Sequence, residues 1–150
     1  MTPETKQLLC RFDELGAFEF PAGFDYGDLE RRATLVYDDI RSFGIQAGFE
    51  DAVYSQDASF SIAIPLHSFE RKEATTTFQP TVRFSNFGNL ATMTWIDQIP
   101  DAARNEIRAS LGRHGFNYVC ADELDCDYDG IMADRKEVFR TWWIRYFDWL

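Results

Sequence analysis

The sequence lacks a hydrophobic run long enough to cross a membrane. Its longest uncharged apolar-rich stretch, residues 58–69, alternates with serine and contains Pro65, so it is too short and too polar to span a bilayer. The opening residues, MTPETKQLLCRFDELG, mix charges with the leucines and lack the continuous apolar core of a signal peptide. We therefore expect no membrane segment, no export signal and a cytoplasmic location.

Cysteine is scarce, and its spacing excludes two common structural roles. Cys10, Cys120 and Cys126 form no C-x-x-C pair, so neither a disulfide framework nor a zinc site is indicated, and we interpret them as reduced thiols. Glycine-rich phosphate loops are absent too, since neither G-x-x-x-x-G-K-[ST] nor G-x-G-x-x-G occurs. The sequence predicts no metal and no cofactor.

Positive charge is also in short supply. Fifteen lysines and arginines stand against 25 aspartates and glutamates, which gives a formal net charge of -10. Because basic side chains supply most of the sequence-independent affinity for a phosphate backbone, we expect no direct nucleic-acid binding. An acidic surface instead favours attraction to basic partners.

The chain does contain enough apolar and aromatic mass for one core. Hydrophobic residues make up 45% of its 150 residues, with 14 phenylalanines, 6 tyrosines and 4 tryptophans. A chain of this length buries about two thirds of its unfolded surface when it folds. No linker or internal repeat divides the chain, so we expect residues 1–150 to form a single domain.

Apolar residues at helical spacing predict three helices. The clearest covers residues 28–43, where the apolar positions recur at steps of four and three before Gly44. A shorter helix is predicted between Pro3 and Gly16, and another between Pro100 and Gly112. An aromatic-rich loop joins the first two helices.

In the middle of the chain the hydrophobic period changes to two, which predicts strands. From residue 58, apolar and small residues alternate as in a half-buried strand, and Pro65 places that strand at a sheet edge or at its own end. HSFERKEA is expected to be an exposed connection. TTTFQPTVRFS and LATMTWI, joined by a turn at residues 86–89, predict a hairpin, and FNYVCA is a further candidate strand. The fold class is therefore α+β, an antiparallel sheet of three to five strands packed against three or four helices.

The C-terminal segment is rich in aromatic residues. Asp134 and Glu137 have capping-box spacing, and KEVFRTWWIRYFDWL then favours a helix, with a strand as the alternative. A single helix has too many aromatics here for all of them to point inward. We therefore consider a dimer or partner surface formed by this aromatic C-terminus.

The segment Asp125-Cys126-Asp127-Tyr128-Asp129-Gly130 matches the first half of an EF-hand calcium loop. Its second half fails, because Lys136 stands at the twelfth position where a bidentate glutamate is needed. A weaker cation site formed by the three aspartates, or a solvated acidic loop, remains as an alternative.

The same loop belongs to a run of acidic residues with no lysine or arginine between His114 and Arg135. Such repulsion is tolerated where water or a partner screens it. A partner that does so should be basic, and an amphipathic tyrosine would suit such an interface. The predicted partner-binding residues are Asp122, Glu123, Asp125, Asp127, Tyr128 and Asp129.

Three functions follow as hypotheses, and no catalytic residue is assigned. The first is an acidic protein-interaction module, such as an immunity-type inhibitor of a basic nuclease. The second is a small-molecule or metal-dependent enzyme with a site around His67, since an imidazole can act as a general base near neutral pH. The third is a homo-oligomeric structural protein. For His114 the sequence predicts a structural role at a helix C-terminus.

Overall fold

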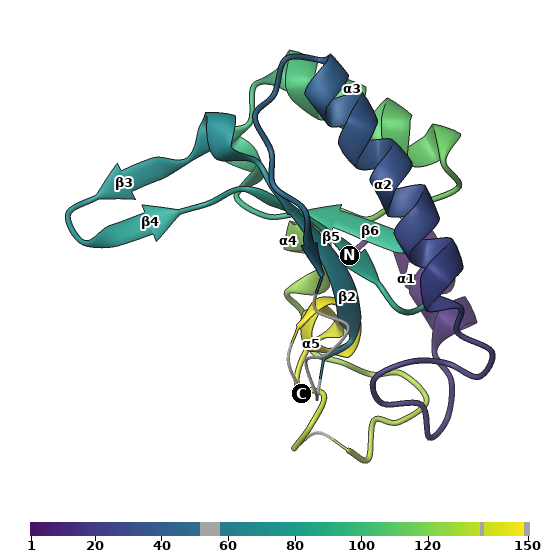
Figure 1. Ribbon diagram of the computed structural model, residues 1–150. Helices are drawn as coiled ribbons and strands as arrows, with labels where there is room; N and C mark the ends of the chain where they lie inside the picture. The colour runs from purple at the N-terminus through teal and green to yellow at the C-terminus, as the bar shows by residue number, and fades with distance from the viewer. Residues whose placement is uncertain (52–57, 136, 149–150) are drawn as a thin grey trace.

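The computed structural model describes residues 1–51, 58–135 and 137–148, and Figure 1 shows the arrangement of its elements. The helices within these ranges are α1 (Pro3–Phe12), α2 (Tyr26–Ser42), α3 (Asp101–Arg113), α4 (Ala121–Leu124) and α5 (Trp142–Phe147), with 3-10 turns η1 (His67–Phe69) and η2 (Ile96–Gln98). The strands are β1 (Glu50–Asp51), β2 (Phe60–Pro65), β3 (Arg71–Glu73), β4 (Thr76–Phe78), β5 (Thr81–Ser85), β6 (Leu90–Met93) and β7 (Asn117–Tyr118). In the described ranges no helix is both long and apolar enough to cross a membrane.

The predicted α+β class is confirmed. Five strands form one sheet in the order β1-β2-β5-β6-β7, and β3 and β4 form a separate two-stranded ribbon. The pairs along the five-stranded sheet are antiparallel except for β6 and β7, which run parallel. The sheet is therefore mixed, because α3 carries the chain back between β6 and β7 as a crossover connection does.

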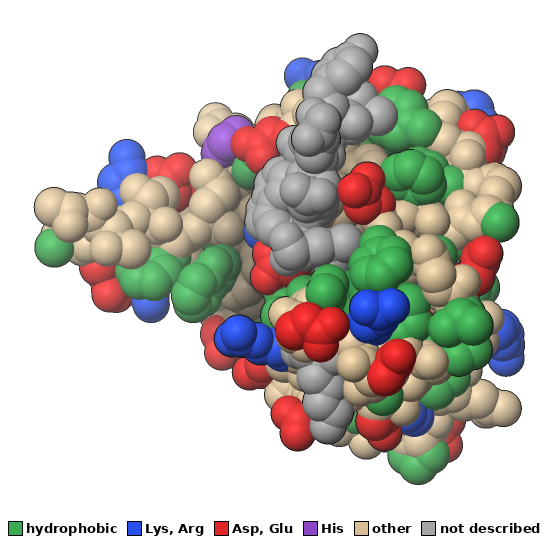
Figure 2. Space-filling model, turned by 90° about the horizontal axis from the view of Figure 1, so that it is seen from below, with side chains coloured by type: hydrophobic (Ala, Val, Ile, Leu, Met, Phe, Trp, Pro, Cys, Tyr) green, Lys and Arg blue, Asp and Glu red, His purple; other side chains and the backbone are tan. Residues whose placement is uncertain are grey.

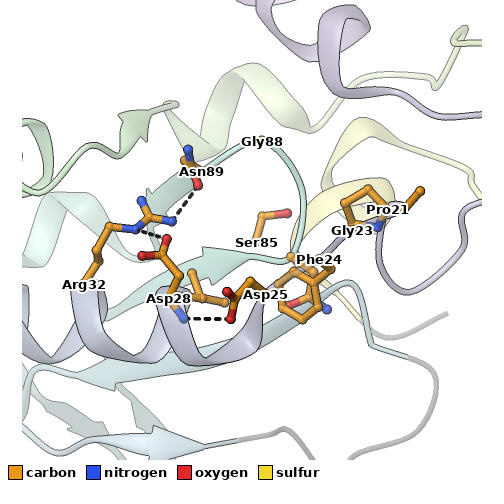
Figure 3. Close-up of a pocket in the computed structure, with 12 residues that line it drawn as sticks. Pro21, Gly23, Phe24, Asp25, Asp28, Arg32, Ser85, Gly88 and Asn89 are labelled. Carbon is orange, nitrogen blue, oxygen red and sulfur yellow. Dashed lines mark hydrogen bonds and ion pairs between the residues drawn. The ribbon is translucent and has the colours of Figure 1, made fainter.

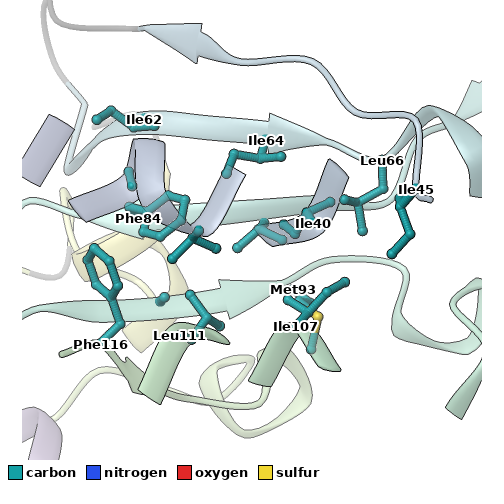
Figure 4. Packing of buried hydrophobic residues seen from close by; sticks show 14 of the residues in the cluster. Ile40, Ile45, Ile62, Ile64, Leu66, Phe84, Met93, Ile107, Leu111 and Phe116 are labelled. Atoms are coloured by element: carbon teal, nitrogen blue, oxygen red, sulfur yellow. The ribbon is translucent and has the colours of Figure 1, made fainter. Parts of the chain in front are cut away.

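One face of the sheet packs against α2 and α3 (Figures 1 and 4). The Asp25 carboxylate caps α2 by accepting from the Asp28 N–H, and Gly44 follows the helix with a positive φ of 82°. The apolar stripe that predicted this helix is buried against the sheet. The main contributors to this core are Leu29, Ala33, Val36, Ile40, Ile62, Ile64, Val82, Phe84, Met93, Ile107 and Leu111.

The opposite face of the sheet is covered as well, so the prediction of a half-buried β2 is wrong. All six residues of β2 are buried. The C-terminal segment lies against this second face, where Arg83 Nη1 donates to the Phe147 carbonyl at 2.7 Å and the Ser59 N–H donates to the Asp148 carbonyl at 3.1 Å. The residues of β2 that were expected to face solvent are therefore buried as well. Pro65 ends the strand, as one of the two alternatives predicted.

Residues 67–85 contain more strand than the sequence indicated. HSFERKEA forms η1 and β3 instead of a plain connection, and TTTFQPTVRFS divides into β4 and β5 around Gln79 and Pro80. Ala74, with a positive φ of 51°, lies in the turn between β3 and β4. The resulting ribbon projects away from the body of the molecule (Figure 1).

The C-terminal helix is shorter than predicted. The Asp134–Glu137 spacing does not begin it; instead Thr141 caps α5 by accepting from the Ile144 N–H at 3.3 Å. Trp142, Tyr146 and Phe147 are fully buried, so these three aromatics pack inside the chain. They point inward because a second core surrounds α5, formed by Leu9, Ala17, Phe87, Leu90, Val119, Leu124, Tyr128, Met132 and Phe139. Trp149 lies outside the described residues, and the dimer or partner surface expected at the aromatic C-terminus stays a prediction.

A carboxylate joins α2 to α3 beside the first core. Asp39 Oδ2 accepts from Ser110 Oγ at 2.7 Å and from Arg113 Nη2 at 2.8 Å, and it lies 2.9 Å from His114 Nε2. These bonds, that of Ser110 foremost, lower the pKa of Asp39 from 3.8 to about 2. His114 is the C-cap of α3, which confirms its predicted place.

This lowered pKa predicts an acid-dependent loss of stability. The contribution of Asp39 is fully present above about pH 4, and it is lost as pH falls through the folded-state pKa of about 2. Replacing Asp39 with Asn should remove about 1 to 2 kcal/mol of unfolding free energy at neutral pH, after allowance for solvent screening. It should also make the unfolding free energy depend less on pH at acid pH. Urea unfolding between about pH 2 and pH 7 measures both effects, with Asp38→Asn as the exposed control. Equal pH profiles for the two variants would contradict the assignment.

Candidate functional site

The predicted partner-binding residues lie on α4 and on the loop that follows it, and α4 contacts α5. We use the name acidic face for Asp122, Glu123, Asp125, Asp127 and Asp129. Tyr128 belongs to the same segment but points the other way, into the second core. The acidic residues differ in how far other parts of the chain already occupy them.

Glu123 is bound to the start of the chain. Its carboxylate accepts from the Thr2 N–H at 2.7 Å and from Thr5 Oγ1 at 3.0 Å. The bond from the Thr2 backbone contributes most to lowering the pKa of Glu123. Glu123 therefore anchors the beginning of α1 to α4.

Asp129 anchors the other end of the acidic face. Its carboxylate forms an ion pair with Lys6 and accepts from Trp142 Nε1 at 3.0 Å. The Lys6 ammonium also lies 4.4 Å from the centre of the Trp142 ring, within cation–π range. The bond from Lys6 is the main cause of the lowered pKa of Asp129. Both ends of the acidic face are thus tied to α1.

Tyr128 is a core residue with an exposure of 1%. Its hydroxyl donates to Asp13 Oδ2 at 2.6 Å and accepts from the Met132 N–H at 3.1 Å. Burial, with the nearby Asp13 carboxylate, raises the pKa of Tyr128. Its ring packs edge-on against Trp142, with centroids 4.7 Å apart. Tyr128, which the sequence placed among the partner-binding residues, therefore does not belong to the exposed surface.

The remaining carboxylates of the acidic face are exposed. Asp122, Asp125 and Asp127 have no side-chain hydrogen bond or ion pair with any residue that the structure describes. They alternate in sequence with Glu123, Cys126 and Tyr128, which are partly or fully buried. The loop thus turns one set of side chains inward and presents three carboxylates to solvent.

Gly130, which the calcium-loop pattern places at the sharp turn, has a different role in the structure. A Cβ at this position would collide with Asp13 Oδ2 and would lie 2.6 Å from the Tyr128 ring. Glycine is therefore required by close packing against a buried carboxylate. Lys136 lies outside the described residues, and no group of three or more His, Cys, Asp or Glu side chains among those described is arranged to hold a metal ion.

A buried ion pair lies directly beneath the acidic face. Arg145 Nε donates to Asp13 Oδ1 at 2.8 Å, and the two side chains are 0% and 2% exposed. Asp13 Oδ2 also accepts from the Ile131 N–H at 2.9 Å. The Arg145 guanidinium lies 4.2 Å from the centre of the Phe87 ring and reaches the Phe18 carbonyl at 3.4 Å. Sequence reasoning missed this pair, because Asp13 and Arg145 lie 132 positions apart and no local pattern connects them.

A hollow of about 310 Å³ adjoins the acidic face. It lies between the start of α1 and the loop, and Lys6 and Trp142 form part of its wall. Asp127 reaches its rim as an exposed carboxylate. The lining residues are Met1, Thr2, Pro3, Lys6, Cys126, Asp127, Asp129 and Trp142.

A second hollow, of about 230 Å³, lies between the start of α2 and the β5–β6 turn (Figure 3). Its charged groups bind one another: Asp28 accepts from Arg31 at 2.6 Å and from Arg32 at 2.8 Å, and Arg32 also donates to Asn89 at 2.6 Å. Two arginine partners lower the pKa of Asp28. The Arg32 side chain is 15% exposed, so this set is largely committed to holding α2 against the turn.

His67, around which an enzyme site was predicted, lines neither hollow. Its side chain is exposed in η1. Neither hollow is lined by a histidine. The enzyme hypothesis around His67 therefore stays a prediction, which neither of these two hollows supports.

Comparisons of the chain with protein-family models, with curated proteins and with solved structures gave no match. The function must therefore be inferred from the residues and geometry of this chain.

The close packing at Gly130 gives a direct test of the base of the acidic face. Gly130→Ala should lower the unfolding free energy by about 1 to 3 kcal/mol, because the added carbon must displace Asp13 or the Tyr128 ring. Gly112→Ala is the matched control, since a Cβ there meets no atom within 4 Å and the position is helical. That control should be neutral or stabilising by up to about 1 kcal/mol. Urea unfolding measures the unfolding free energy of both variants, and equal values would refute the packing role of Gly130.

Proposed function

We propose that the protein is an acidic interaction module that binds a basic protein through Asp122, Asp125 and Asp127. The observation that carries the proposal is their exposure without an intramolecular partner among the described residues. The neighbouring Glu123 and Asp129, in contrast, are engaged by α1 and α5. Three uncompensated carboxylates close together, in a chain of net charge -10, attract positive charge on another molecule.

The anchoring of the loop favours binding. Glu123 is fixed to Thr2 and Thr5, Asp129 is fixed to Lys6 and Trp142, and Tyr128 is buried. The backbone that carries the exposed carboxylates is therefore ordered before a partner arrives. A preordered surface loses less conformational entropy on binding than a mobile loop does, so more of the electrostatic attraction appears as affinity.

The finer form of the proposal is an immunity-type inhibitor of a basic enzyme, such as a nuclease. A nuclease uses cationic side chains to hold phosphates, and a set of carboxylates can occupy those side chains in place of the substrate. The hollow beside Asp127 would admit a long basic side chain of such a partner. This role requires that the inhibitor and its target meet in one compartment, for which we propose the cytoplasm.

The proposal predicts a partner whose binding depends on these three residues and on salt. The unchanged chain and the triple variant Asp122→Asn, Asp125→Asn, Asp127→Asn serve as baits in the native cell extract, and the enriched protein is purified for affinity measurements. The control Glu30→Gln, Asp38→Asn, Glu106→Gln removes the same charge from exposed positions of α2 and α3.

We expect the triple variant to bind at least about tenfold more weakly, and the unchanged chain to lose affinity between low salt and about 0.5 M salt. The control should bind within about twofold of the unchanged chain. The proposal is wrong if no protein is enriched over the triple variant. It is equally wrong if both variants weaken binding to the same extent, or if salt has no effect.

A further inference from the structure

The β3–β4 ribbon is the part of the protein that extends furthest from its core (Figures 1 and 2). All three residues of β3 are exposed, as are Thr76 and Thr77 of β4. The ribbon pairs Arg71 with Phe78 and Glu73 with Thr76 across two strands only. An isolated two-stranded ribbon is at best marginally stable in water, so its projection into solvent needs an explanation.

The ribbon continues the central hairpin of the sheet. β2 and β5 pair in the body, and β3 and β4 extend the same two chain segments outward. In the body β6 covers the outer side of β5, and the Thr94 N–H donates to the Thr81 carbonyl at 3.0 Å where β6 ends. β4 continues past this point, and among the described residues only β3 pairs with it. The side of Thr76–Phe78 that faces away from β3 is called here the β4 edge.

The two strands of the ribbon differ in how their outer edges are protected. Exposed strand edges in monomeric proteins usually carry charged residues, which oppose pairing with another chain. β3 has such residues throughout, in the sequence Arg71-Lys72-Glu73. The β4 edge has none, since it reads Thr76-Thr77-Phe78, and threonine and phenylalanine favour strands. Every second residue of an antiparallel strand directs its N–H and C=O away from its neighbour, so the β4 edge offers free backbone groups.

An exposed aromatic surface lies beside this edge. Trp95 is 53% exposed, and its ring meets the Phe78 ring edge-on with centroids 5.1 Å apart. Its backbone has a positive φ of 50°, a left-handed conformation that is unfavourable for a bulky residue. An exposed indole in a strained conformation next to an unprotected edge is typical of a contact surface.

Charge decides which surface of the ribbon suits a second copy. The charges at the start of the ribbon sum to zero, because two acidic and two basic residues form ion pairs there. Arg71 pairs with Glu73 and Lys72 with Glu70, at 3.2 Å each. The net charge of -10 therefore resides on the rest of the chain. Two copies that meet through their ribbons keep these acidic bodies apart, whereas contact between the bodies would bring like charges together.

We propose that two copies of the chain associate through the β4 edge, so that the two ribbons form one four-stranded antiparallel sheet across a twofold axis. With the axis at Thr77, that residue faces its own copy, and Thr76 of each chain faces Phe78 of the other. Thr–Thr and Thr–Phe pairs of this kind stabilise antiparallel sheets. The Trp95 and Phe78 rings of each chain then cover the ends of the new pairing. The interface is separate from the acidic face and does not rest on its proposed function.

Sedimentation equilibrium over about 10 µM to about 1 mM protein tests this association. We expect the mass to rise with concentration from that of the 17.4 kDa chain toward twice that value. Salt should favour the dimer because it screens repulsion between the acidic bodies, the opposite of its effect on a basic partner at the acidic face. Thr77→Lys, which brings two ammonium groups together at the axis, should remain monomeric over the whole range. Thr75→Lys places the same charge in the turn and should still dimerise.

A second measurement covers the case in which Thr77→Lys disturbs the ribbon itself. In the unchanged chain, amide hydrogen exchange of residues 76–78 should slow at least about tenfold between the lowest and highest concentrations, while exchange in α2 stays constant. A monomeric unchanged chain at every concentration and salt level would overturn the proposal. So would a Thr77→Lys variant that dimerises like the unchanged chain, or exchange at residues 76–78 that does not depend on concentration.

Discussion

The buried ion pair between Asp13 and Arg145 joins parts of the chain that lie far apart in the sequence. Arg145 belongs to α5, Asp13 follows α1, and Asp13 also accepts hydrogen bonds from Tyr128 and Ile131 of the loop after α4. Two charges that are almost fully withdrawn from water are costly unless each is paired and hydrogen-bonded, and a buried pair that loses one partner destabilises a protein by about 3 to 5 kcal/mol. These three segments are therefore held in one arrangement, in which the carboxylate, the guanidinium and the phenol satisfy one another.

The acidic face depends on this arrangement from below. Tyr128 and the Ile131 amide fix the underside of the loop, and Glu123 and Asp129 fix its two ends to α1. With these contacts in place, the intervening aspartates are exposed to solvent. A loop with this much negative charge would otherwise expand through repulsion, since nothing in its own sequence favours one compact form. Its structure is thus supplied by tertiary contacts with the two ends of the described chain.

Local sequence signals predicted the parts of the fold that depend on local physics. The apolar periodicity of α2 and α3 and the turn between β5 and β6 were sufficient, because burial of one face determines each element. The sequence did not reveal that all of β2 is buried, since contacts such as that between Ser59, next to β2, and Asp148 have no local signal. It placed Tyr128 on the surface because its neighbours are acidic, whereas its contacts with Asp13 and Phe139 are set by the fold. The capping-box spacing at Asp134 was misleading in the same way, because Thr141 caps α5 where the second core begins.

Amide hydrogen exchange in the variant Arg145→Met tests most directly whether the buried ion pair holds the loop after α4 in place. Removing the guanidinium leaves Asp13 buried without its cation, so the account predicts faster exchange at Ile131 and Met132, by about a hundredfold if opening becomes about 3 kcal/mol easier. Exchange at Val36, a buried residue of α2, should change much less. Unchanged exchange at Ile131 and Met132, or an equal acceleration at Val36, would contradict the account.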